Sequence, residues 1–319
     1  MNEISPFLEP LIGQYIAFQE ASGRWRSGYI DSLRSFGRHC LLNFPGASEL
    51  SQEMADSWFA KRSTETINSC ISRSYPLASF IAYLKTRGLA DIEVPDMPRA
   101  VPRKYIPHAF SQEELENFFA ACDSIEAKTA NKAHHSRRIT VPVFFRLLYS
   151  SGMRPYEARM LMREDIDLSS GAVNIRKPKG HAQHFAVLHE SMLALLRQYG
   201  AAIGKIYPNR AYFFPYGESG HLPSRWAARN FKEMWVQANA GNAVPYALRH
   251  NYAVENINSW QGEWFGLHSK LLSLSKSMGH SSVESTKYYY SLTPQLACIL
   301  EEKTDEAETI PEARYESIE

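Results

Sequence analysis

Apolar residues recur at helical spacing through the first hundred residues. In segments 7–18 and 77–84 they fall three or four positions apart, which places them on one face of a helix. Ser48 is the expected N-cap of a helix that follows it, and one long helix is predicted over 64–88, ending at Gly88. The pattern therefore predicts a helical N-terminal region.

A proline-rich, basic stretch follows this region. Its sequence, VPDMPRAVPRKYIP, covers residues 94–107 and contains four prolines. Proline fixes φ and removes a backbone donor, so the stretch is predicted to be an extended connector between two domains. A new helix is expected after Ser111, because SQEE places Glu114 three residues later and forms a capping box.

Beyond residue 108 the pattern alternates between helical and strand-like segments. Two short runs, 172–176 and 184–188, are predicted to form a β-hairpin with Gly180 in its turn. The histidines that flank it (His181, His184 and His189) are expected at exposed positions. The predicted helices are 112–122, 138–151, 155–163, 190–199, 223–239, 245–258 and 268–278. The fold class that follows is mainly α with a small β-sheet.

Length and composition narrow the range of function classes. A chain of 319 residues is expected to form about two domains. No apolar run approaches the roughly 20 residues of a membrane span, and the acidic start does not resemble a secretory signal. Four cysteines without a CxxC pair suggest neither a zinc site nor a disulfide framework. A cytoplasmic location fits these observations.

The charge is unevenly distributed along the chain. The net charge is +1, but segment 301–319 alone carries −6, so residues 1–300 carry +7. An excess of this size permits phosphate binding without requiring it.

Four fragments carry the candidate chemistry. They are LLYSSGMRPYEARML, RKPKGHAQHFAVL, YALRHNYA and SMGHSSVESTKYYYSL. Each has an ordinary explanation by itself, such as a surface ion pair, an exposed lysine, a helix-capping histidine or an aromatic stripe. Together they supply cations, hydrogen-bond donors and clustered tyrosines without any metal motif, phosphate loop or carboxylate pair. The combination indicates an anion site with tyrosine as a nucleophile.

In this order the fragments resemble the catalytic boxes of the tyrosine recombinase (phage integrase) family over about 108–292. GMRPYEARML is similar to the first-arginine box and supplies Arg154 and Glu157, while YALRHNYA is similar to the second and supplies Arg249. In the box that contains His280, the family's nucleophile lies nine residues after the histidine, at Tyr289. Tyr288 and Tyr290 are the alternatives if the register differs. The hairpin lysine corresponds best to Lys179, with Lys177 second.

The resemblance implies a role for each of these residues. Arg154 and Arg249 would stabilise the charge on the scissile phosphate, and His280 would hydrogen-bond it. Lys179 would protonate the leaving 5′ oxygen, and Glu157 would orient its neighbours. Tyr289 would form a phosphotyrosine that preserves the bond energy for rejoining. No metal, nucleotide or other cofactor is then needed.

One position departs from the family pattern. Tyr246 stands where members usually carry the histidine of His-x-x-Arg. A phenol keeps its proton at neutral pH, so it can donate a hydrogen bond to phosphate but cannot act as a near-neutral base. Tyr246 is therefore expected to position the phosphate, and either another group accepts the nucleophile's proton or catalysis is slower.

Six further basic residues are predicted to contact DNA phosphates, and plain solvated surface is the alternative for Lys132, Arg137 and Arg138. Three lie in the connector and three near the start of the catalytic region, where a loop is expected. They are Arg99, Arg103, Lys104, Lys132, Arg137 and Arg138. His134 and His135 adjoin the second group, but no acidic or cysteine partner stands at metal-ligand spacing.

By this resemblance residues 1–105 form a helical core-binding domain and 106–292 the catalytic domain, and the two close on double-stranded DNA as a C-shaped clamp. Segment 293–319 holds an exchange helix at 293–303 and an acidic tail, and the exchange would build a homotetramer on two DNA sites. The expected activity is site-specific recombination for a mobile element in the bacterial nucleoid. Two alternatives are a type IB topoisomerase and a non-catalytic DNA-binding relative.

Overall fold

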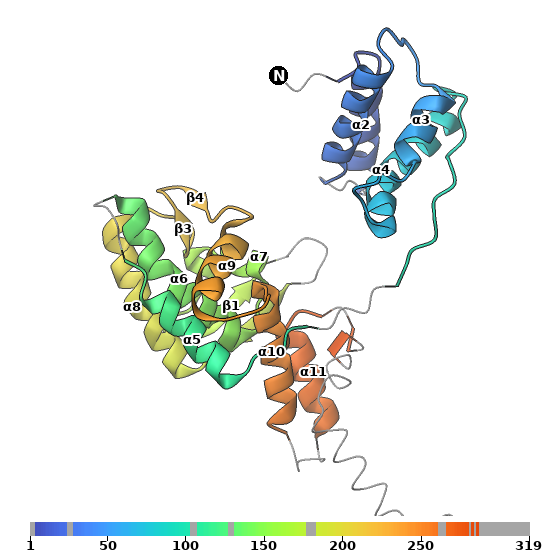
Figure 1. The fold of residues 1–319 in the computed structure, drawn as a ribbon. Coiled ribbons are helices and arrows are strands. Elements are labelled where there is room, and N and C mark those ends of the chain that lie inside the picture. Colours follow the sequence, from blue (N-terminus) through green and yellow to red (C-terminus); the bar gives the residue numbers. More distant parts are fainter. Residues whose placement is uncertain are drawn as a thin grey trace, which may run out of the picture. The chain divides into compact units, whose positions relative to one another are not determined.

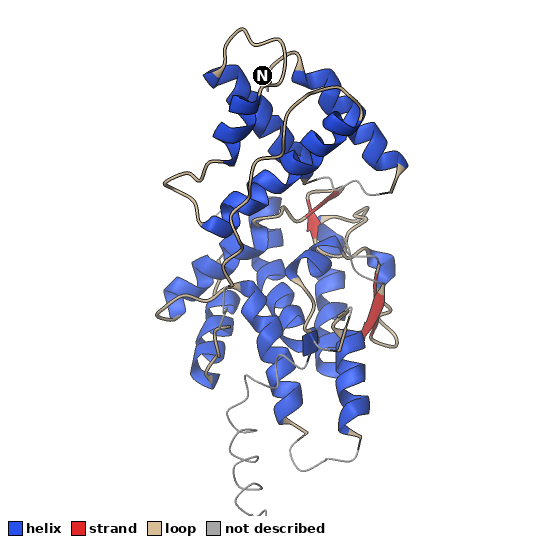
Figure 2. Ribbon diagram, turned by 90° about the vertical axis from the view of Figure 1, so that its right-hand side faces the viewer, coloured by secondary structure: helices blue, strands red, loops and turns tan. Residues whose placement is uncertain are grey.

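The computed structural model describes residues 4–23, 28–102, 107–126, 131–176, 183–260, 266–280, 282–283 and 285–286. Two compact units divide the chain at Met1–Tyr105 and Ile106–Glu319. Both are built mainly from helices, and the strands are short (Figure 2). The predicted fold class, mainly α with a small sheet, is confirmed.

The first unit contains four helices. They are α1 (Leu8–Ala21), α2 (Tyr29–Asn43), α3 (Gln52–Phe59) and α4 (Ile67–Thr86) (Figure 1). Tyr15, Phe36 and Phe80 lie fully buried in the core that these helices enclose. Apolar residues three or four positions apart bring one face of each helix into this core, as the sequence predicts.

The helix ends of the first unit differ from the predicted ones. Ser51, not Ser48, caps α3 by accepting a hydrogen bond from the Met54 backbone N–H at 3.3 Å. Thr66 caps α4 in the same way, which delays the start of that helix beyond residue 64. Gly88 has φ +65°, a conformation that favours glycine just after a helix.

Residues 90–102 contain neither helix nor strand, in agreement with the proline-rich pattern. Asn68 of α4 binds this segment in both directions. Its side-chain amide donates to the Val101 carbonyl at 2.7 Å and its oxygen accepts from the Val101 N–H at 2.9 Å. Asn68 thus attaches the backbone of the connector at Val101 to α4.

The second unit consists of seven α-helices, a 3₁₀ turn and two short hairpins in the part of the chain that is described. The helices are α5 (Gln112–Asp123), α6 (Lys132–Ser151), α7 (Pro155–Met160), α8 (Glu190–Ile206), α9 (Trp226–Ala238), α10 (Pro245–Asn258) and α11 (Leu267–Ser277). The turn is η1 (Arg163–Asp165). The hairpins pair β1 (Ala172–Ile175) with β2 (His184–Val187) and β3 (Pro215–Tyr216) with β4 (Gly220–His221), both antiparallel.

Helix α6 forms the centre of this unit and packs against α8 and α10. Aromatic rings fill the core between α5, α6 and α9: Phe118 contacts Phe145 edge-on, and Phe231 stacks on Trp235 with centroids 5.7 Å apart. Side chains of this size contribute most of the buried apolar area.

Several predicted bounds in this unit hold and others do not. The bounds 245–258 and the capping box of Ser111 and Glu114 are confirmed. Helix α6 begins six residues earlier than predicted, because Asn131 caps it by accepting from the Ala133 N–H at 2.9 Å. Lys132 to Arg138 therefore lie on a helix, and the expected basic loop is wrong.

Two further findings concern the described residues as a whole. Cys40, Cys70 and Cys122 are free thiols. None of the helices there has the length and apolar character required to cross a membrane.

Candidate active site

Arg249 lies on α10 with its side chain fully buried. Its Nη1 donates to the Gly152 carbonyl at 2.6 Å and its Nη2 to the Met278 carbonyl at 2.7 Å. Burying a guanidinium is costly unless carbonyls or anions accept its hydrogen bonds. The second arginine of the sequence pattern is therefore locked between two segments far apart in the chain.

Arg154 precedes α7 and is held from both sides. Its Nη1 donates to the Glu157 carboxylate at 2.6 Å, and Glu157 also accepts from the Arg154 backbone N–H at 2.8 Å. On the other side, Nη1 and Nη2 donate to the carbonyls of Met278 (3.4 Å) and Gly279 (3.1 Å). The Glu157 side chain is fully buried, so it fixes the guanidinium while balancing its charge.

The turn formed by Met278, Gly279 and His280 thus receives both arginines. The Met278 carbonyl accepts from each of them. The imidazole of His280 is joined to the buried Thr286 hydroxyl by a hydrogen bond of 2.7 Å between Nδ1 and Oγ1. The two arginine fragments and the fragment with His280 therefore meet at one place on the second unit.

Glycine is required at two points of this arrangement. Gly152 has φ +64°, and a Cβ there would lie 2.9 Å from Cε1 of Tyr252. Gly279 has φ +63°, and a Cβ there would lie 2.5 Å from Nδ1 of His184. Both glycines place their carbonyls toward an arginine while a ring lies against the α-carbon.

The position of His184 corrects a prediction. The sequence pattern places this residue on the exposed side of the hairpin, but only 8% of its surface is accessible. His184 and Ala186 face inward on β2, whereas Phe185 and Val187 are exposed. His189, in contrast, caps α8 by accepting from the Ser191 N–H.

Tyr246 stands at the start of α10 and remains 39% exposed. Its ring meets the edge of His250 one turn later, with centroids 5.1 Å apart. Burial, and then the positive charge of Arg249, lower the pKa of His250 to about 4. This histidine is therefore neutral at physiological pH, next to a permanently charged arginine.

The comparisons with known proteins identify the family of this chain. Residues 109–295 match the model of the phage integrase family. The chain belongs to that family. It is thus a site-specific DNA recombinase, an enzyme that transfers DNA strands.

Relatives extend the likeness over nearly the whole chain. A Sinorhizobium fredii protein described as an integrase/recombinase, y4rE, is 25% identical over 95% of this chain and 97% of its own length. The tyrosine recombinase XerC of Oceanobacillus iheyensis is 26% identical, with 92% and 93% covered.

Solved structures show the same fold at lower identity. The XerH recombinase bound to its difH substrate has a TM-score of 0.58 and 18% identity, covering 87% of this chain and 78% of that one. A λ integrase dimer on a core site has a TM-score of 0.57 and 14% identity, with 86% and 96% covered.

Several predicted residues of this recombinase lie outside the described residues. They are Tyr289 with its neighbours Tyr288 and Tyr290, the lysines Lys177 and Lys179, the connector residues Arg103 and Lys104, and the exchange segment 293–303. Their roles stay predictions.

The predicted phosphate contacts that are described lie at the surface. Arg99, Lys132 and Arg138 are exposed. Arg137 is engaged within the unit, since its Nε donates to Asn230 at 2.7 Å and its Nη2 pairs with Glu233 at 2.7 Å.

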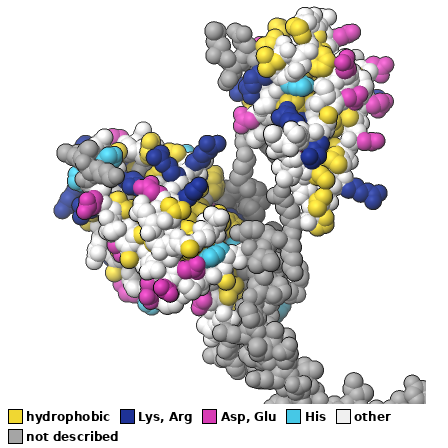
Figure 3. All heavy atoms as spheres, viewed as in Figure 1, with side chains coloured by type: hydrophobic (Ala, Val, Ile, Leu, Met, Phe, Trp, Pro, Cys, Tyr) yellow, Lys and Arg dark blue, Asp and Glu magenta, His cyan; other side chains and the backbone are white. Residues whose placement is uncertain are grey.

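A hollow of about 740 Å³ lies beside Arg137, between α6, α9 and the second hairpin. Arg225 and Arg229 also line it, and both are exposed. Lys and Arg side chains gather near β3, β4 and α9 on the face drawn in Figure 3. These two arginines are absent from the residues predicted to contact DNA; their four-residue spacing at the start of α9 is the signal that could have found them.

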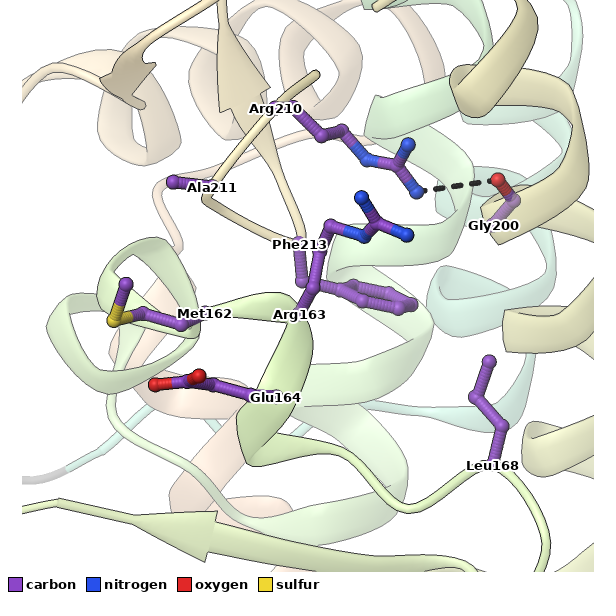
Figure 4. Close-up of a pocket in the computed structure, with 8 residues that line it drawn as sticks. All are labelled: Met162, Arg163, Glu164, Leu168, Gly200, Arg210, Ala211 and Phe213. Atoms are coloured by element: carbon purple, nitrogen blue, oxygen red, sulfur yellow. Dashed lines mark hydrogen bonds between the residues drawn. The ribbon is translucent and has the colours of Figure 1, made fainter. Parts of the chain in front are cut away.

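A second hollow, of about 580 Å³, lies apart from the catalytic set (Figure 4). Arg210 points into it toward Arg163, and donates to the Tyr207 and Gly200 carbonyls at 3.3 and 3.2 Å. Arg210 thus satisfies carbonyls at the C-terminal end of α8, which is a structural role.

Metal ligation finds no support among the described residues. No group of three or more His, Cys, Asp or Glu side chains there could hold a metal ion. His134 and His135 are exposed on the first turn of α6.

Proposed function

We propose that this recombinase cleaves and rejoins double-stranded DNA through a covalent 3′-phosphotyrosine on Tyr289. One observation carries the proposal: Arg154 and Arg249 both donate to the Met278 carbonyl, two residues before His280. Two permanent cations in adjoining positions form a cradle for the non-bridging oxygens of one phosphate. Tyr289 follows His280 by nine residues.

The proposed reaction is a transesterification that needs no external energy. The phenol of Tyr289 gives its proton to a general base as its oxygen attacks phosphorus, and the bond from phosphorus to the 5′ oxygen breaks. Lys179 donates a proton to that oxygen, which leaves as a hydroxyl. A 5′ hydroxyl from the exchanged strand then attacks the phosphotyrosine, and the phenol regains its proton.

Glu157 and Tyr246 have supporting roles in this proposal. Glu157 holds Arg154 by two hydrogen bonds, one from the guanidinium and one from the backbone N–H. Tyr246 stands at the exposed end of α10, three residues before Arg249, where its hydroxyl can donate to the phosphate. Because it lacks a basic site, it does not accept the proton of Tyr289.

Both units would contact the DNA, and the protein would act as a homotetramer on two sites, with 293–303 exchanged between copies. Arg99, Lys132 and Arg138 would contact backbone phosphates, together with Arg103 and Lys104, and Arg225 and Arg229 would add contacts beside Arg137. Recombination of a mobile element in the bacterial nucleoid fits the likeness to integrases.

Covalent capture tests the proposal and identifies the target sequence in the same experiment. The protein is incubated with fragmented genomic DNA of its host carrying random nicks, and complexes that survive detergent are sequenced. We expect the captured fragments to share an inverted repeat; a duplex with this repeat is called the captured duplex. Binding without any covalent capture would favour the non-catalytic alternative.

A supercoiled plasmid with two copies of the captured duplex distinguishes recombination from the topoisomerase alternative. Recombination predicts deletion or inversion between the copies. Relaxation that needs neither copy, without any exchange, would identify a topoisomerase.

A further inference from the structure

The hairpin of β1 and β2 contains an inward-facing histidine that the proposed reaction does not use. His184 is the first residue of β2 and pairs with Ile175 on β1. It is 8% exposed, and the inward positions around it are apolar. An imidazole in such a place calls for a reason other than solubility.

The His184 ring lies directly on the turn that receives both arginines. A Cβ built on Gly279 would come within 2.5 Å of Nδ1 and 2.8 Å of Nε2, and would also meet Cε1. Since three atoms of the ring approach one position, the face of the imidazole covers the α-carbon. Helix α11, which ends just before this turn, packs against β2 as well.

This contact bears on the catalytic geometry through backbone carbonyls. The Gly279 carbonyl accepts from Arg154, and the adjacent Met278 carbonyl accepts from Arg154 and Arg249. Close-packed interiors transmit small displacements to their neighbours. A shift of the ring would therefore move the acceptors that aim both guanidiniums.

We propose that His184 is a positioning residue for DNA cleavage. Its ring packs against the 278–280 turn and holds the backbone carbonyls that orient Arg154 and Arg249. In this way β2 supports the arginine pair. His184 follows Lys179 by five residues in the sequence, so the strand that begins soon after the predicted catalytic lysine also packs on the turn that receives both arginines. This inference rests on the proposed function of the two arginines.

The first experiment measures single-turnover cleavage of the captured duplex at saturating protein. We expect His184→Ala to slow cleavage about 10- to 100-fold, because ångström-scale misplacement of catalytic groups costs about this much. DNA affinity should stay within about threefold, since the ring touches the turn and not the surface. His184→Phe, which keeps a flat ring, should recover most of the rate, whereas His184→Gln should not.

Val187→Ala is the matched control on the same strand. Val187 is 76% exposed and faces away from the turn, so its truncation should leave the rate unchanged. If His184→Ala does not fold, the proposal is tested by the ratio of the cleavage rates of His184→Phe and His184→Gln. Equal rates for these two variants, or a wild-type rate for His184→Ala, would overturn the proposal.

A sulfur-substituted substrate distinguishes the arginine route from the lysine route. Sulfur in place of the 5′ bridging oxygen gives a thiolate leaving group that needs no proton. We expect this substrate to rescue Lys179→Ala but to leave the His184→Ala defect in place. Rescue of His184→Ala would show that it acts through the lysine instead. Absence of any adduct with the wild-type protein would mark failure of the proposed function itself.

Discussion

Two glycine turns hold the arginine pair, and they are supported in different ways. At Gly152 the covering ring is Tyr252, which lies on α10 three residues after Arg249. At Gly279 the covering ring is His184, which comes from the hairpin. The first turn is thus braced by the helix whose arginine it receives, whereas the second depends on a separate element. Both supports are long-range contacts, but the first comes from the helix that supplies the bound arginine and the second from a strand that supplies neither arginine.

The largest expected effect comes from removing either arginine. Arg154→Ala and Arg249→Ala should each slow cleavage of the captured duplex by about 10²–10³, the usual loss for one preorganised donor. Single-turnover formation of the covalent adduct measures this. Arg→Lys variants at the same positions keep the charge and control for folding. Cleavage near the wild-type rate would remove that arginine from the site.

Gly152→Ala tests the support that Tyr252 of α10 gives to the first turn. A side chain there adds a strained positive φ to a collision with the Tyr252 ring, so we expect a loss above about 3 kcal/mol in the free energy of unfolding. Gly217→Ala is the control in the same unit, because Gly217 has φ +71° but nothing within 4 Å of its Cβ position. It should cost only about 1 kcal/mol in urea unfolding. Equal losses would mean that the Tyr252 contact is unimportant.

Tyr246→Phe examines the exposed end of the same helix. Loss of one hydrogen bond to a charged group costs roughly 1.5–3 kcal/mol, so cleavage should be about ten- to a hundredfold slower. Tyr246→His should be tolerated, because the Tyr246 side chain is 39% exposed to solvent and a smaller ring fits in its place. A Tyr246→Phe protein without any activity would show that the hydroxyl is essential, contrary to the positioning role proposed for it.

A smaller effect is expected from pH. His250 has a folded-state pKa of about 4 and an ordinary value near 6.5, so the unfolded chain binds the extra proton first as pH falls. The contribution of His250 to the free energy of unfolding is therefore present above pH 6.5 and is lost as the pH falls from 6.5 toward 4. The loss at pH 5 relative to pH 7.5 is about 2 kcal/mol. Urea unfolding of the wild type and of His250→Gln at both pH values measures this loss. If the variant loses as much stability as the wild type between pH 7.5 and pH 5, a group other than His250 is responsible.

The sequence predicted the parts of the site that depend on residue type and order. The resemblance predicted Arg154 and Arg249 at one site, and both donate to the Met278 carbonyl. Helix 245–258 was predicted with both bounds from its helical pattern, and it begins at Pro245, a residue that suits the first helical position.

The rest of the site depends on tertiary structure that periodicity does not report. Strand alternation shows which residues share a face, but not which face is buried, so the side predicted for His184 is wrong. The acceptors of the arginines are backbone carbonyls of Gly152, Met278 and Gly279, and a carbonyl has no signature in residue type. The caps at Ser51 and Asn131 were missed because several polar residues near each helix start can serve.

The position of the phosphotyrosine tests the central claim most directly. The adduct between the wild-type protein and the captured duplex is digested with protease and nuclease, and mass spectrometry locates the modified residue. We predict a nucleotide on Tyr289, together with loss of the adduct but retention of DNA binding in Tyr289→Phe. Modification of Tyr288 or Tyr290, with full adduct formation by Tyr289→Phe, would contradict the nine-residue register from His280.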